Sequence, residues 1–554
     1  MIELRKPKVL WVGEASWLSS GFSTYSLEVL KRLHARGTLD LVEFACYGEH
    51  DDARRHLVPW EVFQNVPNFA DPAQAGQYRS CKLNEFGMWK FEEALLKYRP
   101  DAVVAFRDWW MDEFMEHSPF RRFYHWCVMP TVDSMPQADS WVATYMNADA
   151  VFAYTDWGLQ TLSEQTGGKI KGVVPTPPGA DLETFRPVED KRAVKEAIGM
   201  PSDALVVGTV MRNQIRKLYP DLIKAFGRFM REGPQDIAKR SYLYLHTSFP
   251  DLGWDIPRLV LEQGVASRTL FTYLCRACGA SYPSFFNDAR AFCRSCRQQT
   301  SFLPDVGNGV TRDVLARAYS LMDVYVQLAT NEGFGMPMVE AGACGLSVMA
   351  TDYSAMSDVV RKLGGVPIKC QLYREPGSMA YRAQPNEDDF VAGLTRLLTN
   401  EQERLRMGRD ARQGVETHYT YEKTAETWAN YLEKVPLHDP KETWDSPARI
   451  HTPNTEVPNG LTDSEYVRWC ILNLTGRPEL LDSYMALRMT RDLNWGLTRD
   501  GMGGLAYNDA SVVGVGEARE NNFKPCTREE LGKQLLDICH RNNYWEKRRV
   551  EVAK

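Results

Sequence analysis

Four cysteines in two close pairs offer the clearest chemistry in this chain of 554 residues. Cys275 and Cys278 form one Cys-x-x-Cys pair, and Cys293 and Cys296 form a second pair after a short loop. Two such pairs at this separation are typical of a tetrahedral zinc site, in which four thiolates leave no position for a reacting water. The pattern therefore predicts one structural zinc ion bound by these four side chains. Two disulfide bonds are the alternative.

Two glutamates lie eight positions apart around a glycine loop in the segment Asn331 to Ala341. Gly333 and Gly335 let backbone N–H groups approach an anion, and the following helix adds its positive N-terminal end, so the loop suits a diphosphate. Glu332 lies in the loop, where it can accept hydrogen bonds from sugar hydroxyls. Glu340 lies about two turns further on, where it can bind a ribose diol. The alternative is an ordinary strand, loop and helix with a salt-bridged glutamate.

Arg212 and Lys217 follow a strand that we expect over Ala204 to Val210. A departing diphosphate needs compensating charge in a dry site, and fixed cations supply it. We therefore expect both side chains to neutralise phosphate oxygens. An isolated arginine and lysine are more often solvated surface residues. The assignment of this pair to phosphate binding therefore depends on the glycine loop in the same half of the chain.

The elements that must position these residues follow a regular rhythm, in which short apolar runs alternate with amphipathic helical stretches. Such alternation predicts parallel strands joined by crossover helices. In the first part of the chain, a helix is expected over Gly21 to Arg36. The strands expected there are Lys8 to Val12, Leu41 to Tyr47, Val103 to Phe106, Phe123 to Val128 and Val151 to Tyr154.

A second series begins after the proline-rich passage Val174 to Gly179. Ligands of open parallel sheets bind beyond the carboxyl ends of the strands. We expect two doubly wound α/β domains, over residues 1–185 and 186–435, whose edges face a cleft. The strands expected in the second series are Ala204 to Val210, Tyr242 to Thr247, Leu270 to Leu274, Val324 to Leu328 and Ser347 to Ala350, and the helices are Pro220 to Met230, Thr311 to Leu321 and Pro337 to Cys344.

Two further regions stand outside this rhythm. Residues 275–304 are expected to form a small zinc-ribbon insertion within the second domain. Residues 436–554 are expected to form a linker and a mainly helical extension, with helices over 463–474, 478–492 and 527–542.

The segment Asn331 to Ala341, together with the two cations, resembles the retaining family 4 glycosyltransferases of GT-B fold, relatives of glycogen and sucrose-phosphate synthases. The resemblance implies two Rossmann-like domains facing a cleft. It also implies transfer of a sugar from a nucleoside-diphosphate sugar to an acceptor with retention of configuration. The donor-binding residues that it implies are Gly21, Gly333, Phe334, Gly335 and Glu340, and the catalytic residues are Asp133, Arg212, Lys217 and Glu332.

The first domain carries the resemblance less completely. The loop Gly13 to Ser23, with Gly21, lies where the family has a glycine-containing loop against the donor phosphate, and it lacks the GxGxxG pattern of dinucleotide-dependent dehydrogenases. Asp133 stands where many family members place a histidine near the reactive carbon of the sugar. It can orient a sugar hydroxyl or accept the proton of the acceptor, and a helix N-cap is the alternative. Arg107 and His125 are further polar candidates from neighbouring strand ends.

No Asp-x-Asp motif occurs in the sequence, so a metal-bridged diphosphate has no support from it. We expect no catalytic divalent metal and assign charge neutralisation to the cations and helix dipoles. The resemblance implies same-face attack, in which the leaving phosphate helps to deprotonate the acceptor while an oxocarbenium-like sugar is held in place.

Arginines and aromatic side chains are interleaved through the expected insertion, against the single acid Asp288. Such residues can stack on bases and pair with phosphates. Because the insertion leaves the carboxyl end of a strand, we expect it to project over the cleft and to help choose the acceptor. The alternative is that the aromatics form the core of a zinc ribbon. The residues concerned are Arg276, Arg290, Arg294, Arg297, Tyr273, Tyr282, Phe285, Phe286 and Phe292.

The composition narrows the class of protein. A formal net charge of −6 argues against a protein whose whole surface binds DNA or anionic lipid. The short apolar segment near the amino terminus and the lack of a long uncharged stretch predict neither a secretory signal nor a spanning helix. Most cysteines are scattered singly, as buried thiols are, so we expect a reducing, cytoplasmic compartment.

The chain also resembles glycosyltransferases of tailed bacteriophages around Ser20 to Phe22 and His246 to Ser248. For such proteins, in the host cytoplasm, a modified base in DNA is a candidate acceptor, and a surface saccharide is the rival. A non-catalytic, zinc-bearing nucleic-acid-binding protein on a GT-B body is a second class of function. The presence of Glu332, Glu340, Arg212 and Lys217 weighs against it. Nucleotide-sugar epimerisation is disfavoured, because no additional acid/base pair is evident.

Overall fold

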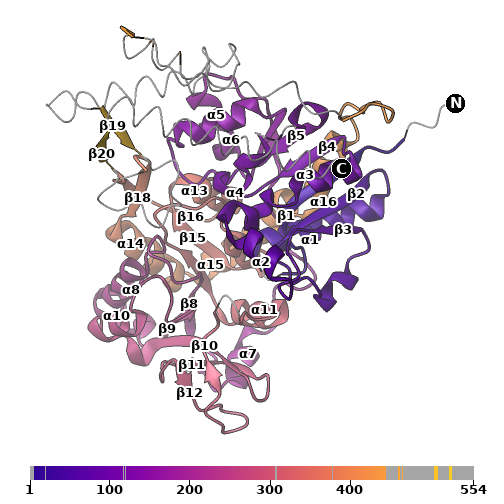
Figure 1. The fold of residues 1–554 in the computed structure, drawn as a ribbon. Helices are drawn as coiled ribbons and strands as arrows, with labels where there is room; N and C mark the ends of the chain where they lie inside the picture. The colour runs from indigo at the N-terminus through magenta and orange to yellow at the C-terminus, as the bar shows by residue number, and fades with distance from the viewer. Residues whose placement is uncertain are drawn as a thin grey trace.

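Two parallel β-sheets with their helices make up most of the computed structural model (Figure 1). The structure describes residues 5–444 apart from 19, 117, 119, 306–307 and 377, and beyond 444 it describes 459–461, 465, 469, 505–508 and 523–526. Among these residues, every helix is too short or too polar to cross a lipid bilayer. The expected α/β class with two parallel sheets is confirmed.

All seven strands of the first sheet are parallel, in the spatial order β3-β2-β1-β4-β5-β6-β7. Because β1, β4 and β5 are neighbours, the loops that follow them meet at one edge of the sheet. The strands are β1 (Lys8–Glu14), β2 (Asp40–Cys46), β3 (Glu61–Gln64), β4 (Ala102–Ala105), β5 (His125–Val128), β6 (Ala150–Ala153) and β7 (Gly172–Pro175). The helices are α1 (Gly21–Arg36), α2 (Pro72–Arg79), α3 (Phe91–Tyr98), α4 (Trp109–Asp112), α5 (Asp139–Asn147) and α6 (Asp156–Gln165).

The second sheet has the order β12-β13-β10-β9-β8-β14-β15-β16, with β11 paired to β10. Its six strands from β10 to β16 along this order are parallel, whereas β11, β12 and β13 pair antiparallel beside β10. The strands are β8 (Leu205–Val210), β9 (Ser241–His246), β10 (Thr269–Cys275), β11 (Ser281–Phe285), β12 (Arg290–Ala291), β13 (Ser301–Phe302), β14 (Val324–Gln327), β15 (Ser347–Thr351) and β16 (Val366–Ile368).

The α-helices described in this part of the chain include the three that were predicted and seven that were not. They are α7 (Lys191–Ala197), α8 (Tyr219–Glu232), α9 (Gln235–Ala238), α10 (Ile256–Glu262), α11 (Arg312–Leu321), α12 (Met336–Ala343), α13 (Ser354–Lys362), α14 (Glu387–Thr399), α15 (Glu401–His418) and α16 (Tyr421–Leu432). A separate antiparallel hairpin, β17 (Cys370–Arg374) with β18 (Tyr381–Pro385), was also not predicted.

The helix α16 packs on the first sheet, although it follows the second sheet in sequence (Figure 1). Its Trp428 ring lies 5.4 Å from that of Trp11 on β1 and 4.2 Å from that of Phe152 on β6. The indole N–H of Trp428 donates to the Tyr25 hydroxyl at 2.7 Å. These fully buried aromatic contacts tie the end of the described body back to the first domain.

The predicted strands and helices of both series are present, with bounds that differ by at most two residues. Helix α1 shows why its bounds could be read correctly. The Ser20 hydroxyl accepts from the Ser23 N–H at its start, and Gly37, with φ of 68°, ends it in the left-handed conformation.

The predicted tail helices at 463–474, 478–492 and 527–542 lie outside the described residues, apart from Glu465 and Trp469. Beyond residue 444 the structure describes two short strands, β19 (Leu505–Asn508) and β20 (Phe523–Cys526), which pair antiparallel. They were not expected in an extension predicted to be mainly helical.

Candidate functional site

Two loops at the carboxyl edge of the second sheet lie side by side. One follows β8 and carries Lys217, and the other follows β14 and carries Glu332. Backbone hydrogen bonds join them, from Leu218 N to Leu328 O at 3.1 Å and from Thr330 N to Arg216 O at 2.9 Å. This pairing places the predicted lysine directly beside the predicted glutamate.

The buried carboxylate of Glu332 is the centre of the site. It forms an ion pair with the Lys217 ammonium and accepts from Arg216 Nη1 at 2.8 Å and from Gln327 Nε2 at 3.3 Å. Ser354 holds its backbone, because the serine hydroxyl lies 3.1 Å from both the N–H and the carbonyl oxygen of Glu332. Ser354 itself has φ of 53°, an uncommon conformation for a non-glycine residue. The loop is thus held in one geometry.

The two glycines of the loop are required by close packing and by backbone conformation. A Cβ atom on Gly333 would lie 2.3 Å from Cγ2 of Thr131 in the first domain. Gly335 begins α12 with φ of 93°, and a Cβ atom there would lie 2.7 Å from the Gln327 amide nitrogen. Glycine is therefore needed at both positions for this loop to lie on the first domain and to open the helix.

Asp133 reaches the same place from the first domain. Its carboxylate accepts from the Asn331 amide and from the Ser134 hydroxyl at 2.8 Å, and it lies 3.8 Å from Arg382 Nη1. The N-cap alternative for Asp133 is wrong, because the next helix, α5, starts six residues later with Ala138 as its cap residue. The side chain instead bridges the two domains.

Asp108 is a second carboxylate at this edge, and the sequence analysis did not single it out. It follows β4 and precedes α4, and its side chain makes no capping hydrogen bond. Burial, followed by the negative charge of Asp133, raises the pKa of Asp108 to about 6, while Thr131 and Arg216 act in the opposite direction. Asp108 therefore lies close to charged groups of both domains, Asp133 in the first and Arg216 in the second.

Arg212 is not in contact with Glu332. Its guanidinium binds the Asp251 carboxylate through two bonds of 2.9 Å, and 40% of the side chain is exposed. This guanidinium is the main reason why the pKa of Asp251 falls to about 2. Of the two predicted cations, Lys217 lies at Glu332, and Arg216 lies where Arg212 was expected.

The remaining predicted donor residues occupy three different settings. Glu340 accepts from the Tyr319 hydroxyl at 2.7 Å, and burial raises its pKa. The ring of Phe334 is buried at 5.6 Å from Tyr419, so its side chain packs in the core. Gly21 begins α1, and a Cβ atom on it would lie 3.8 Å from the Met336 sulfur at the start of α12. The two helix N-termini therefore face each other across the domains.

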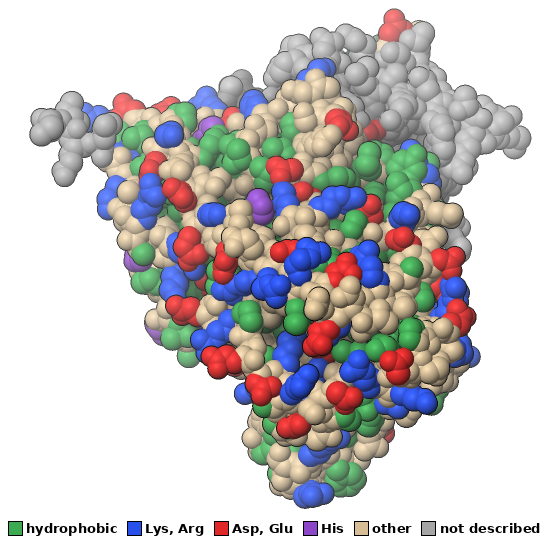
Figure 2. Space-filling model, turned by 180° about the vertical axis from the view of Figure 1, so that it is seen from behind, with side chains coloured by type: hydrophobic (Ala, Val, Ile, Leu, Met, Phe, Trp, Pro, Cys, Tyr) green, Lys and Arg blue, Asp and Glu red, His purple; other side chains and the backbone are tan. Residues whose placement is uncertain are grey.

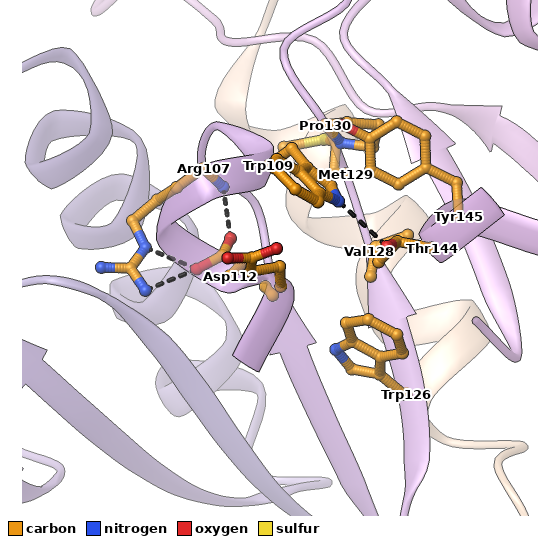
Figure 3. A pocket seen from close by; sticks show the side chains of 11 residues that line it. Arg107, Trp109, Asp112, Trp126, Val128, Met129, Pro130, Thr144 and Tyr145 are labelled. Carbon is orange, nitrogen blue, oxygen red and sulfur yellow. Dashed lines mark hydrogen bonds and ion pairs between the residues drawn. The ribbon is translucent and has the colours of Figure 1, made fainter. Parts of the chain in front are cut away.

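The two fallback residues have structural partners. Arg107 is buried and holds Asp112, with Nε 2.9 Å from the carboxylate (Figure 3). His125 lies at the start of β5, away from the carboxyl edge, and its Nε2 lies 2.8 Å from the Tyr431 hydroxyl. A cavity of about 10 Å³ beside Trp109 and Arg107 has room for about one water molecule. It is too small for a sugar nucleotide.

Four further residues contact Glu332 or Asp133 and were not predicted as site residues. Arg216 adjoins Lys217 and was visible as a charge, but only the tertiary structure turns it toward Glu332. Asn331 adjoins Glu332 and reaches Asp133. Ser354 and Arg382 come from α13 and β18, far along the chain, and no spacing in the sequence marks them.

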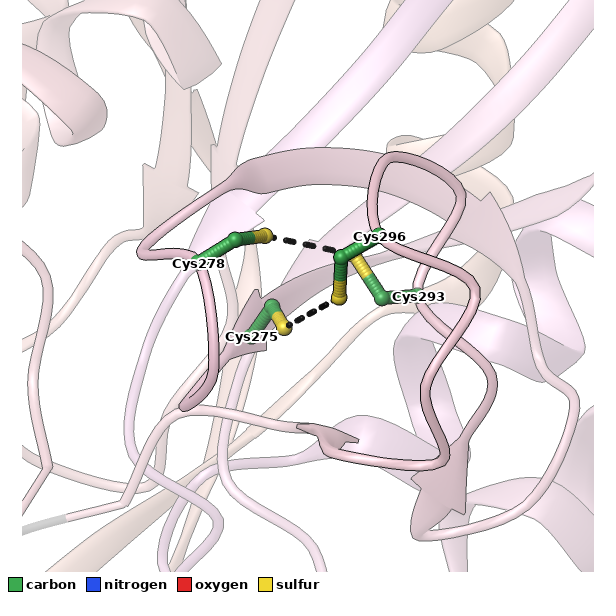
Figure 4. A group of neighbouring side chains, drawn as sticks. All are labelled: Cys275, Cys278, Cys293 and Cys296. Carbon is green, nitrogen blue, oxygen red and sulfur yellow. Dashed lines mark hydrogen bonds between the residues drawn. The ribbon is translucent and has the colours of Figure 1, made fainter.

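The four cysteines gather as the pattern predicted (Figure 4). Their sulfur atoms all lie within 4.8 Å of one another, and the pairs Cys275–Cys296 and Cys278–Cys293 are each 3.6 Å apart. A tetrahedral zinc–thiolate site has sulfur atoms about 3.8 Å apart, whereas a disulfide requires about 2.05 Å. The cluster therefore suits a metal ion, and the disulfide alternative does not fit.

The insertion lies at the lower end of the second domain in Figure 1 and forms the narrow end of the molecule in Figure 2. Its hydrogen bonds and ring contacts within the described residues involve its own residues or the second domain. Examples are the ring contact of Phe286 with Phe249 and the hydrogen bond that Arg317 donates to the Ser281 hydroxyl. The insertion was expected to project over the cleft between the two domains. In the structure it lies at the end of the second domain that is away from the first sheet.

Some aromatic side chains of the insertion form its core, and others are exposed to solvent, where they are available to an acceptor. Tyr273 is fully buried, and Tyr282 and Phe286 pack against the core, as the zinc-ribbon alternative requires. Phe285 and Phe292 are exposed, by 42% and 62%.

Comparisons with known proteins point to one family. Residues 305–414 match the model of the family Glycosyl transferases group 1. The D-inositol 3-phosphate glycosyltransferase of Stackebrandtia nassauensis is 26% identical over 265 residues, which are 48% of this chain and 49% of that protein. The enzyme of the same name from Kineococcus radiotolerans is 29% identical over 216 residues, covering 38% and 42%. The chain thus spans about half the length, or less, of these curated relatives.

Two solved structures share the fold. Sucrose-phosphate synthase from Thermosynechococcus elongatus has a TM-score of 0.55 at 17% identity, covering 78% of this chain and 99% of that one. Anabaena HepE, in complex with UDP and glucose, has a TM-score of 0.53 at 15% identity, covering 77% and 99%. The chain therefore has the GT-B-like fold of these proteins, and its residues 305–414 carry the sequence pattern of the group 1 glycosyl transferases.

Proposed function

We propose that this protein is a glycosyltransferase that moves a sugar from a nucleoside-diphosphate sugar to an acceptor with retention of configuration. The observation that carries the proposal is the convergence of Lys217 and Arg216 on Glu332, beside the glycine loop that opens α12. Two cations, a glycine loop and a helix N-terminus together form a setting for a diphosphate.

The roles follow from this arrangement. Lys217 and Arg216 compensate the charge of the departing phosphate, and Arg212 joins them on leaving Asp251. Glu332 then turns from its cations to the hydroxyls of the donor sugar, and Glu340 binds the ribose. Asp133 holds the acceptor hydroxyl, and the leaving phosphate takes its proton as the new bond forms on the same face of the sugar. The proposal includes no catalytic divalent metal.

The donor is supported by names of similar proteins, such as the UDP complex of HepE. The sequence suggests two classes of acceptor. One is a modified base in DNA, for a protein encoded by a tailed bacteriophage, and the other is a saccharide. The names of the relatives add phosphorylated polyols, such as D-inositol 3-phosphate. The compartment proposed from the unpaired thiols is a reducing cytoplasm.

The metal proposed for the cysteine cluster is zinc, held by Cys275, Cys278, Cys293 and Cys296. Four sulfur ligands at these separations favour a closed, structural site. Its contribution is the stability of the insertion.

The test is a screen of nucleotide sugars by thermal shift, followed by turnover on saccharides, polyol phosphates and hydroxymethylated DNA. We expect one donor to raise the unfolding temperature and to be consumed with at least one acceptor. Proton NMR of the product should show the anomeric configuration of the donor. A protein that binds none of the donors would contradict the proposal.

A further inference from the structure

Three carboxylates stand at the carboxyl edge of the first sheet. Glu14 ends β1, Asp108 follows β4 and Asp133 follows β5, and these three strands are neighbours. Glu14 is held by the Ser20 hydroxyl. Asp108 forms no ion pair with any described residue, and Asp133 lies 3.8 Å from its nearest cation. The first-domain edge is therefore acidic.

The facing edge of the second domain carries several cations. Arg212, Arg216 and Lys217 all follow β8, and Arg382 comes from the hairpin strand β18. Arg382 is itself engaged by Glu375 at 2.8 Å. The cations of the second domain are paired with acids of their own domain, Asp251, Glu332 and Glu375, whereas Asp108 of the first domain has no ion-pair partner among the described residues.

A group of tryptophans adjoins the carboxylates. Trp109 and Trp110 directly follow Asp108, and their rings lie 6.1 Å and 5.7 Å from that of Trp141 on α5. All three side chains are partly exposed. Trp109 is fixed by its N–H bond of 2.9 Å to the Thr144 hydroxyl (Figure 3). Tryptophan offers a large, rigid apolar face with a polar edge.

We propose that Asp108, Asp133 and Trp110 form the acceptor subsite, and that this subsite takes an uncharged saccharide in preference to a phosphorylated one. The inference rests on the proposed function and names the class of its acceptor. Ionised carboxylates accept hydrogen bonds from sugar hydroxyls, and an aromatic face packs on the C–H face of a sugar ring. The same carboxylates repel a phosphate ester and the backbone of DNA.

The pH dependence of acceptor use follows from the surroundings of Asp108. The charged and titratable groups that face it are Asp112 of α4, Asp133 of the β5–α5 loop, Arg216 of the β8–α8 loop, Tyr145 of α5 and Tyr154, which directly follows β6. With a pKa of about 6, the Asp108 carboxyl is charged above that pH and protonated below it. Acceptor kcat/KM therefore falls as the pH drops through about 6, and Asp108→Asn removes that limb of the profile.

The test compares neutral saccharides with their 6-phosphates as acceptors, together with a hydroxymethylated oligonucleotide. We expect wild-type kcat/KM to be at least about tenfold higher for a neutral saccharide, and Asp108→Asn to narrow that ratio several-fold. Asp133→Asn should also narrow the ratio of kcat/KM between neutral and phosphorylated saccharides. The matched control is Asp51→Asn, whose side chain is 92% exposed and lies outside the site.

Nucleotide-sugar binding and donor hydrolysis without acceptor are measured on the same variants. Both should be unchanged in the control Asp51→Asn. A wild-type protein that neither binds nor hydrolyses any donor would refute the proposed function itself, and not this inference alone. Preferred use of a sugar phosphate or of the oligonucleotide would overturn the inference. So would an unaltered ratio and pH profile in Asp108→Asn. A third outcome would also overturn the inference. In that outcome the protein binds a donor, but no saccharide serves as an acceptor and no saccharide changes the tryptophan fluorescence on addition.

Discussion

At the scale of single residues, the account depends on which cations act on the donor. Lys217 is nine-tenths buried against Glu332, whereas Arg212 is held by Asp251 at the surface. We predict that Lys217→Ala lowers kcat by a factor on the order of 10² to 10³, because a fixed charge is lost where charge develops in the transition state.

Arg212→Ala gives the same order of loss if Arg212 leaves Asp251 in the reaction. Steady-state kinetics with saturating donor measure both effects. Lys224→Ala is a suitable control, because its exposed ammonium pairs with Glu387 away from the site. Wild-type kcat in Lys217→Ala would contradict the role given to this lysine.

How far the site could be predicted also differs from residue to residue. Lys217, Glu332, Gly333 and Gly335 could be selected from the sequence because they belong to two short loops, and the structure brings these loops together. Arg216 was given no role, since the directions of adjacent side chains on an irregular loop are decided by tertiary packing. Asp108 lacks a motif altogether, because its role comes from groups on other strands.

At the scale of elements, the loop before α12 must lie on the first domain. A Cβ atom on Gly333 would meet Cγ2 of Thr131 at 2.3 Å, but would lie 3.6 Å from its Cβ. We predict that Gly333→Ala lowers kcat/KM by at least about tenfold, since misplacement near 1 Å can cost on the order of 10² in rate.

Thr131→Ser removes the clashing methyl group and keeps the hydroxyl. The double variant Gly333→Ala with Thr131→Ser should therefore recover most of the activity that Gly333→Ala loses. Thermal unfolding checks that each variant folds. A double variant as inactive as Gly333→Ala would show that the close approach to Thr131 is not the cause.

The insertion is the second element with a prediction of its own. We expect one zinc ion per chain, and its binding can contribute on the order of 10 kcal/mol to the folding of a small module. Chelation, or Cys293→Ser, should make residues 275–304 susceptible to proteolysis while the two sheets stay folded. Metal analysis by mass spectrometry and limited proteolysis measure this, and the substitution Cys46→Ser, at a buried cysteine outside the cluster, is the control. A metal-free native protein would contradict the assignment.

Sequence periodicity predicted the central elements well because apolar strands and amphipathic helices carry their own pattern. The hairpin β17–β18 escaped prediction, as its strand residues are mostly exposed or only partly buried and show no apolar run. The position of the insertion was also misjudged. The carboxyl end of β10 does belong to the functional edge, but β10 lies toward the outer side of the sheet, and its antiparallel partners carry the chain away from the first domain.

At the scale of the whole molecule, the two domains are joined by ion pairs as well as by the site. Glu28 of α1 accepts from Arg312 of α11 at 2.6 Å, and also from Arg32 at 2.7 Å. Burial opposes ionisation of Glu28, but these two guanidinium groups prevail and hold its pKa below the ordinary value.

The sign of the pH effect follows from that lowered pKa. Glu28 contributes stability above the ordinary glutamate pKa, and this contribution is lost as the pH falls through the lowered value in the folded state. We predict that wild-type protein loses its stability advantage over Glu28→Gln below about pH 4. The difference in unfolding temperature between the two proteins, measured from pH 3 to 7, tests this, and a difference that is independent of pH would contradict it.

Lys217, Glu332 and the start of α12 together form the proposed binding site for a nucleoside diphosphate. Titration calorimetry of UDP and other nucleoside diphosphates into wild-type protein and Lys217→Ala tests it most directly. The account predicts that one of them binds the wild-type protein, and that the variant binds it weaker by a factor on the order of 10 to 100, the worth of one charge-assisted hydrogen bond. Equal affinity in the two proteins, or no binding of any nucleoside diphosphate, would contradict it.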